Sequence, residues 1–368
     1  MYRTYNGILI GLVALTALCG TILVQWLQPL SGDLTRLGGY SENEFGWTGA
    51  EAVFTPPLAA SGDPGAYYDV VVLGDSFSLR TTPDRQTRSG GFWVDFLAAN
   101  TGLSVGVFFI EKMPPERLFD DRRYRSHPPR LVIVELVERS LGHQLLGNGG
   151  ACPGTSSPGF DLALMPRTEV PIAIRRDVVP EWNEAAIGQA IDHLAKSIPR
   201  RLVGWDGSKV KRLRLSRDDL FTSVDPADLL VYQDDFIKRT WRDQDWAAMR
   251  CRLLDWQARS EANGQTRFLV VVAPDKSSAY APYLAEDVRQ PNGVAELAEA
   301  PTLHMPRVDL ALRNAIQSGV KDVYLPNDTH WGSAGSGIVA KSVIAYLKGD
   351  GLKEDGGASK PTAEAAVR

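Results

Sequence analysis

Short, uncharged runs rich in β-branched residues recur along the chain and alternate with longer stretches of helical character. The first run, Tyr68–Leu73, has the composition of a strand that is buried on both faces. Similar runs follow at Leu103–Ile110, Leu131–Val137, Phe268–Ala273 and, more weakly, Val320–Leu325, and the helical stretches are Gly91–Asn100, Trp241–Asn263, Val308–Ser318 and Ser333–Leu347. This alternation predicts a three-layer α/β/α domain around a mostly parallel sheet, in which ligands bind beyond the carboxyl ends of the strands.

The N-terminus carries a different signal. Twenty residues from Ile8 to Leu27 have no charge, and as a helix they would span roughly 30 Å, enough to cross the hydrocarbon core of a bilayer. Arg3 precedes the run, which favours a cytoplasmic N-terminus, and Trp26 lies at its far end, where an interfacial aromatic is expected. A cleaved signal peptide and a buried core helix are the alternatives, but no small-residue cleavage site follows the run. We therefore expect residues 1–30 to be a single-pass anchor, with the remainder of the chain outside the cytoplasm.

The remainder is expected to be one domain with an insertion. Residues 31–65, rich in Gly, Pro and small residues, have the composition of a linker with little regular structure. The domain would extend over residues 66–347, with an insertion at about 140–240 that contains a helix near Glu181–Ser197. Residues 348–368 are rich in Gly, Ala and charge and are predicted to be disordered.

Composition narrows the functional classes. Lys and Arg number 40 against 44 Asp and Glu, a net charge of −4 that argues against a nucleic-acid partner. The basic run at 209–217 alternates with Val and Leu, which favours a solvated edge strand over a site for an anionic polymer. Three cysteines and five histidines have no metal-ligand spacing, so neither a metal nor another cofactor is expected. With Cys19 in the apolar run, Cys152 and Cys251 form either a disulfide or two buried thiols.

Two motifs point to nucleophilic catalysis. Gly74-Asp75-Ser76 follows the first strand and would place the serine on a tight turn at the carboxyl edge of the sheet. Asp328 and His330 come 254 residues later, after the last predicted strand, and so belong to the same edge. His330 could then act as general base towards Ser76, with Asp328 holding the imidazole in the required tautomer. The structural alternatives are a capping serine and a histidine satisfied within the core.

These residues carry a family resemblance. Gly74-Asp75-Ser76-Phe77-Ser78 with a late Asp-x-His resembles the SGNH (GDSL-type) hydrolase superfamily, whose fold is flavodoxin-like. Residues 270–284 (VVVAPDKSSAYAPYL), 328–331 (DTHW) and 131–141 resemble the alginate O-acetyltransferase-like SGNH proteins of exopolysaccharide export. The resemblance covers residues 68–347 in patches. It implies a periplasmic Ser-His-Asp site that moves acetyl groups onto a polysaccharide, and a membrane-bound O-acyltransferase partner that delivers the acetyl group.

The chain departs from the family pattern in two ways. Ser76 precedes Asp-x-His, as in ordinary SGNH hydrolases and unlike the alginate enzymes. The oxyanion-hole Asn of ordinary SGNH esterases is also missing after the third strand, where this chain has Arg139. Arg139 would either donate to the developing oxyanion or form an ion pair with Glu135 or Glu138. Gly91 is a further candidate for an oxyanion-hole amide.

Three more residues are weaker candidates for substrate binding. Lys276 and Tyr280 follow the fourth strand and would face the same sheet edge, where they either bind a sugar or acetyl carbonyl or serve loop packing. Trp331, beside the histidine, either stacks on a sugar ring or packs beneath the loop.

Together with the apolar N-terminal run, the resemblance implies a membrane-anchored O-acetyltransferase of the bacterial inner membrane, with its catalytic domain in the periplasm. Acetyl would be held on Ser76 as an ester and passed to a hydroxyl of an exported polysaccharide. A carbohydrate acetylesterase with the same site and a non-catalytic polysaccharide-binding scaffold are the alternatives.

Overall fold

The computed structural model describes residues 2–26, 31–79, 90–147, 152, 172–175, 184–204, 209–286 and 290–349. The tail expected to be disordered lies, apart from its first two residues, outside the described residues.

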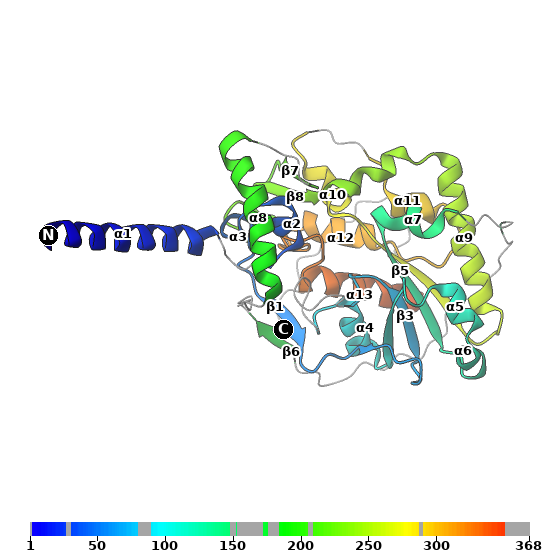
Figure 1. The fold of residues 1–368 in the computed structure, drawn as a ribbon. Coiled ribbons are helices and arrows are strands. Elements are labelled where there is room, and N and C mark those ends of the chain that lie inside the picture. The colour runs from blue at the N-terminus through cyan, green and yellow to red at the C-terminus, as the bar shows by residue number, and fades with distance from the viewer. Residues whose placement is uncertain are drawn as a thin grey trace, which may run out of the picture.

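The centre of the domain is a five-stranded sheet whose paired neighbours all run parallel, in the order β2-β4-β3-β5-β9 (Figure 1). The strands are β2 (Ala60–Ser61), β3 (Val70–Gly74), β4 (Val105–Phe109), β5 (Leu131–Val137) and β9 (Arg267–Ala273). The chain passes from β3 to β4 on one side and then crosses to β5 on the other, so the strand order reverses beside β3. In open α/β sheets such a switch point leaves a crevice at the carboxyl ends of the strands.

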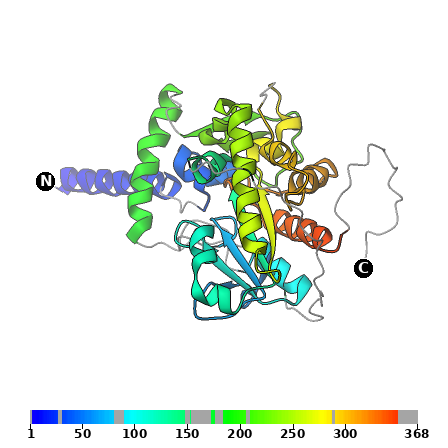
Figure 2. The ribbon, with the colours of Figure 1, turned by 90° about the vertical axis from the view of Figure 1, so that its right-hand side faces the viewer.

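Helices cover both faces of this sheet, as the sequence pattern predicts. One face packs against α4 (Trp93–Thr101), α12 (Val308–Gln317) and α13 (Ser333–Leu347). The other packs against α5 (Pro115–Asp120), α6 (Arg122–Ser126), α7 (Leu141–Leu145), α9 (Asp243–Glu261) and α11 (Gly293–Ala298). Figure 2 looks onto the second face, with α9 crossing in front of the strands.

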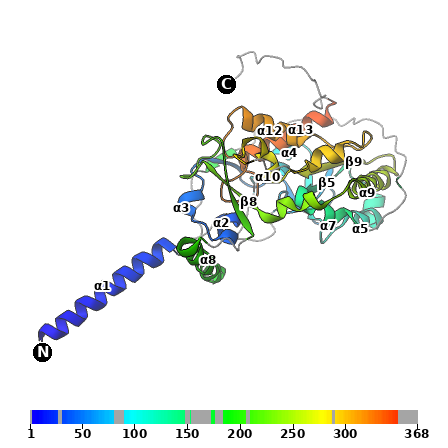
Figure 3. The ribbon, with the colours of Figure 1, turned by 90° about the horizontal axis from the view of Figure 1, so that it is seen from above.

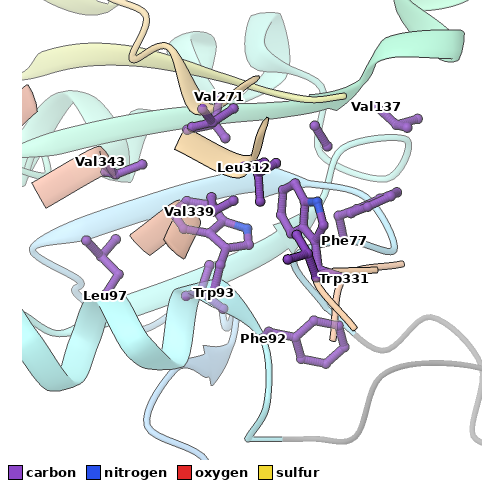
Figure 4. Packing of buried hydrophobic residues seen from close by; sticks show 14 of the residues in the cluster. Phe77, Phe92, Trp93, Leu97, Val137, Val271, Leu312, Trp331, Val339 and Val343 are labelled. Carbon is purple, nitrogen blue, oxygen red and sulfur yellow. The ribbon is translucent and has the colours of Figure 1, made fainter. Parts of the chain in front are cut away.

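Alternation along β3 explains the two cores. Val70 and Val72 belong to the first cluster, whereas Val71 and Leu73 belong to the second, because successive side chains of a strand point to opposite faces. The first cluster continues toward the carboxyl edge through Trp331, which packs against Phe77 with ring centroids 4.8 Å apart (Figure 4).

The weakest predicted strand, Val320–Leu325, does not join the sheet. The chain there folds back on itself instead, with a single bridge between Tyr324 and Trp331 and a hydrogen bond from Leu325 N to His330 O (3.0 Å). The backbone groups that would have extended the sheet therefore hold the turn that carries His330.

The prediction that residues 31–65 form a linker with little regular structure is wrong. It contains α2 (Asp33–Gly38), α3 (Glu42–Phe45), β1 (Glu51–Phe54) and β2. Leu34, Tyr40 and Phe45 are buried with Val210 and Leu230 in a third apolar cluster. These few apolar residues pack on the domain, which the Gly- and Pro-rich composition of the segment concealed.

The insertion forms helical and strand elements of its own. They are β6 (Ile172–Arg175), which pairs antiparallel with β1; α8 (Glu184–Val203); and an antiparallel pair, β7 (Val210–Arg214) and β8 (Asp228–Tyr232). Three short 3-10 helices, η1 (Glu138–Ser140), η2 (Gln233–Thr240) and η3 (Ala281–Tyr283), and the single turn α10 (Lys276–Ala279) complete the described elements. A disulfide joins Cys152 to Cys251 and so ties the insertion to α9.

The N-terminal apolar run forms α1 (Tyr2–Trp26), which projects from the globular part (Figures 1 and 3). Within it, Tyr2–Thr21 is long and apolar enough to cross a membrane and is not buried by the rest of the chain. The helix is therefore a candidate membrane span.

Candidate active site

Ser76 lies on a tight turn directly after the central strand β3. Asp75 stabilises the turn, because its side chain accepts a hydrogen bond from Phe77 N (2.9 Å) and its carbonyl accepts one from Ser78 N (3.0 Å). Gly74 allows the close approach this turn requires: a Cβ there would lie 2.5 Å from Ser78 Oγ. Ser76 is thereby held at the switch point of the sheet.

A buried glutamate, not foreseen from the sequence, supports this turn from below. Glu135 on β5 accepts hydrogen bonds from Asp75 N (3.0 Å) and from Ser78 Oγ (2.8 Å), and Trp93 Nε1 donates to Ser78 Oγ (2.9 Å). Burial, followed by the charge of Asp75, raises the pKa of Glu135 well above its ordinary value. The sequence feature that could have indicated this role is that Glu135 is the single acidic residue within the apolar strand run Leu131–Val137.

His330 and Asp328 meet the serine, as the two motifs predict. His330 Nε2 lies 2.8 Å from Ser76 Oγ, and His330 Nδ1 lies 2.5 Å from Asp328 Oδ1. The backbone N–H of His330 also donates to Asp328 Oδ1 (2.9 Å). Burial alone would lower the pKa of His330, but the charge and hydrogen bond of Asp328 outweigh it and raise that pKa. This is the geometry in which histidine removes a serine proton and a carboxylate stabilises the resulting imidazolium.

A second carboxylate, Asp33, completes the cluster. It accepts hydrogen bonds from Thr329 N (2.8 Å) and Thr329 Oγ1 (2.6 Å), its backbone N–H donates to Asp328 Oδ2 (3.1 Å), and its Oδ2 lies 3.9 Å from His330 Nδ1. Burial and then the charge of Asp328 raise the pKa of Asp33. Sequence reasoning missed this residue because it lies in the segment expected to be a linker.

Asp33, Asp328 and His330 are also the described residues whose side-chain ligand atoms lie close enough together, within 4.8 Å, to be considered for a metal ion. These atoms are instead hydrogen-bonded to one another and to Thr329, and His330 turns its other nitrogen to Ser76. The arrangement is therefore that of a proton-transfer site.

Replacing Asp33 by Asn is expected to shift the pH dependence of the site. The negative charge of Asp33 raises the pKa of His330, so its removal lowers that pKa, and the neutral imidazole needed as a base then persists to lower pH. The acidic limb of the pH–rate profile should move to lower pH, together with a fall in the plateau rate as Thr329 loses a carboxylate acceptor. Titration of ester turnover against pH tests this. An unchanged acidic limb would contradict it, and Asp63→Asn on an exposed loop is the control.

The three weaker candidates for substrate binding, for which packing was the alternative, are buried. Lys276 Nζ donates to the backbone carbonyls of Leu325 (2.7 Å), Pro326 (2.9 Å) and Asp328 (3.1 Å), and burial lowers its pKa to about 7. Tyr280 is fully buried, and its hydroxyl accepts a hydrogen bond from Tyr324 N (3.4 Å). Trp331 is 1% exposed and belongs to the core. For all three the packing alternative applies: Lys276 holds the turn that carries His330, and the two aromatic rings support it.

Arg139 lies beside the cluster but does not pair with Glu135 or Glu138. Its Nη1 lies 3.0 Å from Asp275 Oδ1 and 3.6 Å from Asp235 Oδ1. Its guanidinium carbon is 5.9 Å from the centroid of the Phe77 ring, which in turn lies 4.7 Å from the His330 ring. Burial would lower the pKa of Arg139, but Asp275 and then Asp235 outweigh it and raise the pKa. A permanent cation therefore stands next to the Ser76 turn.

A buried ionic cluster lies behind Arg139 and was not predicted. Lys238 Nζ lies 2.7 Å from Asp275 Oδ2 and 2.8 Å from Glu138 Oε2, and all three side chains are inaccessible to solvent. Glu138 also accepts hydrogen bonds from Asp275 N (2.8 Å) and Gly293 N (2.6 Å). The cluster thus joins η1, η2 and the loop after β9, and it fixes the position of Asp275, the partner of Arg139.

Gly91 is the remaining candidate. It is buried just before α4, next to Gly90, whose positive φ of 89° and carbonyl bond to Phe54 N shape the entry to that helix. The described hydrogen bonds do not connect Gly91 to Ser76 or His330. Its role as an oxyanion-hole donor stays a prediction.

A serine on the turn after the central strand β3, joined to a histidine and an aspartate from a late Asp-x-His, defines a hydrolase-like site of the SGNH type. Residues 228–367 match a protein family described as an SGNH hydrolase-like domain of acetyltransferase AlgX, which confirms the predicted family. The matched segment includes Asp328 and His330, whereas Ser76 lies outside it. No significant match was found among curated proteins or among solved structures.

Proposed function

We propose that the protein is an O-acetyltransferase that carries acetyl on Ser76 and transfers it to a hydroxyl of an exported polysaccharide. The observation that carries this proposal is the hydrogen-bonded chain from Ser76 Oγ through His330 to Asp328 at the switch point of the sheet. The description of the matched family, an acetyltransferase with an SGNH hydrolase-like domain, supports acetyl as the transferred group.

In the first half-reaction Ser76 Oγ attacks the acetyl carbonyl of the donor while His330 Nε2 takes the hydroxyl proton. The tetrahedral intermediate collapses, the bond to the donor's leaving group breaks, and His330 returns the proton to that group, which leaves an ester on Ser76. In the second, a sugar hydroxyl gives its proton to His330 and attacks this ester. Collapse then releases the acetylated sugar, and the proton returns to Ser76 Oγ.

The negative charge that develops on the acetyl oxygen requires donors. Arg139 is placed to supply such donors, because its guanidinium lies against Phe77, the residue after the nucleophile, and is fixed there by Asp275. We assign Arg139 to stabilisation of the oxyanion or of the bound acetyl carbonyl, and Gly91 remains the backbone candidate for the same role.

The site lies where an acetyl donor in the membrane could reach it. If α1 is an inner-membrane anchor, Asp33 in the cluster lies only six positions beyond Leu27, where the apolar run ends. Six residues reach at most about 22 Å even when fully extended. The catalytic domain would then stand in the periplasm with its site close to the bilayer, within reach of a membrane-bound O-acyltransferase that presents the acetyl group.

The deciding experiment measures where the acetyl group goes. The full chain in detergent is mixed with an activated acetyl ester, with and without polysaccharide fragments, and intact mass and acetylated products are followed. A transferase should form an acetyl adduct on Ser76 that is slow to hydrolyse and is discharged by the sugar. Rapid release of acetate, unchanged by sugar, would replace the proposal with an acetylesterase, the activity favoured by the hydrolase-like order of Ser76 and Asp-x-His. Absence of any adduct or turnover would favour the scaffold.

A further inference from the structure

The helix α8 of the insertion exposes its apolar face, whereas an ordinary surface helix buries that face. Ile191, Ala195, Ile198 and Leu202 recur at spacings of four, three and four residues, which places them on one face, and all four are exposed. Ile198 is 41% exposed and Leu202 78%. A helix that packs on a globular domain normally turns such a stripe toward the core.

The side of α8 that faces the domain is polar. His193 and Ser197 are buried, and Arg200 Nη2 donates to the carbonyl of Gly38 (2.5 Å) while its guanidinium lies 3.8 Å from the centroid of the Tyr40 ring. Gly39 allows this close contact, since a Cβ there would lie 2.7 Å from Lys196 Cβ. The polar contacts to α2 therefore determine which face of α8 is buried, and they direct the apolar stripe outward.

This stripe is concentrated at one place on the molecule. Outside α1, the described part of the chain has seven exposed large apolar residues, and four of them, Ile191, Ile198, Leu202 and Val203, belong to α8. Apolar patches of this kind mark surfaces that contact a partner or a membrane.

The position of α8 relative to α1 indicates that the partner of the exposed stripe is the membrane. In Figure 1, α8 forms the edge of the globular part from which α1 emerges, and it runs crosswise to α1; Figure 3 shows the same end of the molecule with α8 beside the base of α1. A helix that crosses the end of a membrane-spanning helix lies along the bilayer surface. Because the inner face of α8 packs on α2, its exposed stripe faces the side on which α1 lies.

The charges of α8 suit the same surface. Three basic residues of α8, Lys196, Arg200 and Arg201, stand against two acids, Glu184 and Asp192. Arg200 is held on the inner face by Gly38 and Lys196 pairs with Asp192, so Arg201 is the basic residue exposed beside the stripe. Amphipathic helices with basic flanks bind in the interface of bilayers that contain anionic lipids.

We propose that α8 is an interfacial helix that inserts its stripe of Ile191, Ala195, Ile198 and Leu202 into the lipid surface next to the α1 anchor. This proposal rests on the membrane anchoring assumed in the proposed function. Together the two helices fix the orientation of the domain as well as its distance from the bilayer. Since α8 packs on α2, which carries Asp33, the orientation is passed to the active site.

Site-directed spin labelling of the full chain in vesicles tests the proposal. Single labels are introduced through Ile198→Cys and Leu202→Cys in a Cys19→Ser background, with Asp192→Cys as the matched control, because Asp192 is exposed on the same helix but off the stripe. The ratio of oxygen to water-soluble nickel-chelate accessibility is then measured in phosphatidylcholine vesicles with and without phosphatidylglycerol. Labels at 198 and 202 should show a clearly higher ratio than the label at 192, and phosphatidylglycerol should increase the difference.

A spin label on the native Cys19 distinguishes a failure of the α8 proposal from a failure of the α1 anchor. If Cys19 is in lipid while 198 and 202 are as accessible to nickel as 192, the inference about α8 is wrong, and a membrane protein becomes the alternative occupant of the stripe. If Cys19 is itself in water, the anchor is wrong and the α8 inference falls with it. These positions are exposed, so labelling leaves the packed face of α8 intact.

Discussion

Replacing Ser76 by Ala is expected to reduce acetyl transfer by about 10⁴- to 10⁶-fold, because the variant loses the atom that forms the ester and leaves His330 without a proton to remove. The acetyl adduct should disappear from the intact-mass spectrum at the same time. The fold should be unaffected, since among the described residues Ser76 Oγ is hydrogen-bonded to His330 alone. Initial rates with an activated acetyl ester and thermal unfolding of the same sample measure both effects.

Ser78 provides a matched control two residues away. Its hydroxyl donates to Glu135 and accepts from Trp93 inside the core. Ser78→Ala should therefore form the acetyl adduct but lose about 1–3 kcal/mol of stability, because two buried polar groups lose a partner. The two serines should thus separate chemistry from folding. Residual transfer above a hundredth of the wild-type rate in Ser76→Ala would assign the nucleophile to another residue.

Lys238→Met is expected to give the largest loss of stability. The ammonium group lies within 2.8 Å of two carboxylate groups, on Asp275 and Glu138, and none of the three side chains reaches solvent. Removing one partner of a buried ion pair leaves charge without compensation and typically costs about 3–5 kcal/mol. The melting temperature of the full chain in detergent should fall by on the order of 10 °C.

Lys196→Met is the corresponding control at the surface. Lys196 pairs with Asp192 on α8, where solvent screens the charges, so its loss should cost less than about 1 kcal/mol. A Lys238→Met variant as stable as Lys196→Met would contradict the assignment of Lys238 to a stabilising buried ion pair. Because Asp275 also holds Arg139, Lys238→Met should reduce acetyl transfer even below its unfolding temperature.

The site was predictable in part because its chemistry follows from local order along the chain. Ser76 comes after a strand that had to be buried, and His330 comes before a helix whose start and end the pattern identified correctly. Parallel strands place their carboxyl ends at one edge, so two motifs 254 residues apart could be expected to meet. The fold class and the pairing of Ser76 with His330 and Asp328 rest on that argument.

The surroundings of these residues were not predictable in the same way. Lys276, Tyr280 and Trp331 have side chains that suit sugar binding, and only their burial assigns them to the support of the His330 turn. Asp33 belongs to a segment with the composition of a linker, and it becomes part of the site through the packing of Leu34 and Phe45 against β7 and β8.

The layers of the domain, the apolar N-terminal helix and the sheet edge that carries the chemistry could be predicted from sequence alone, because each depends on periodicity within a short stretch of chain. Folding of the whole chain was needed to show which polar side chains reach that edge, which of them are buried as supports, and which face of α8 is left exposed. Those outcomes depend on contacts between segments far apart in the sequence, such as the hydrogen bond from Arg200 to Gly38, which is one of the polar contacts that hold the inner face of α8 on the domain.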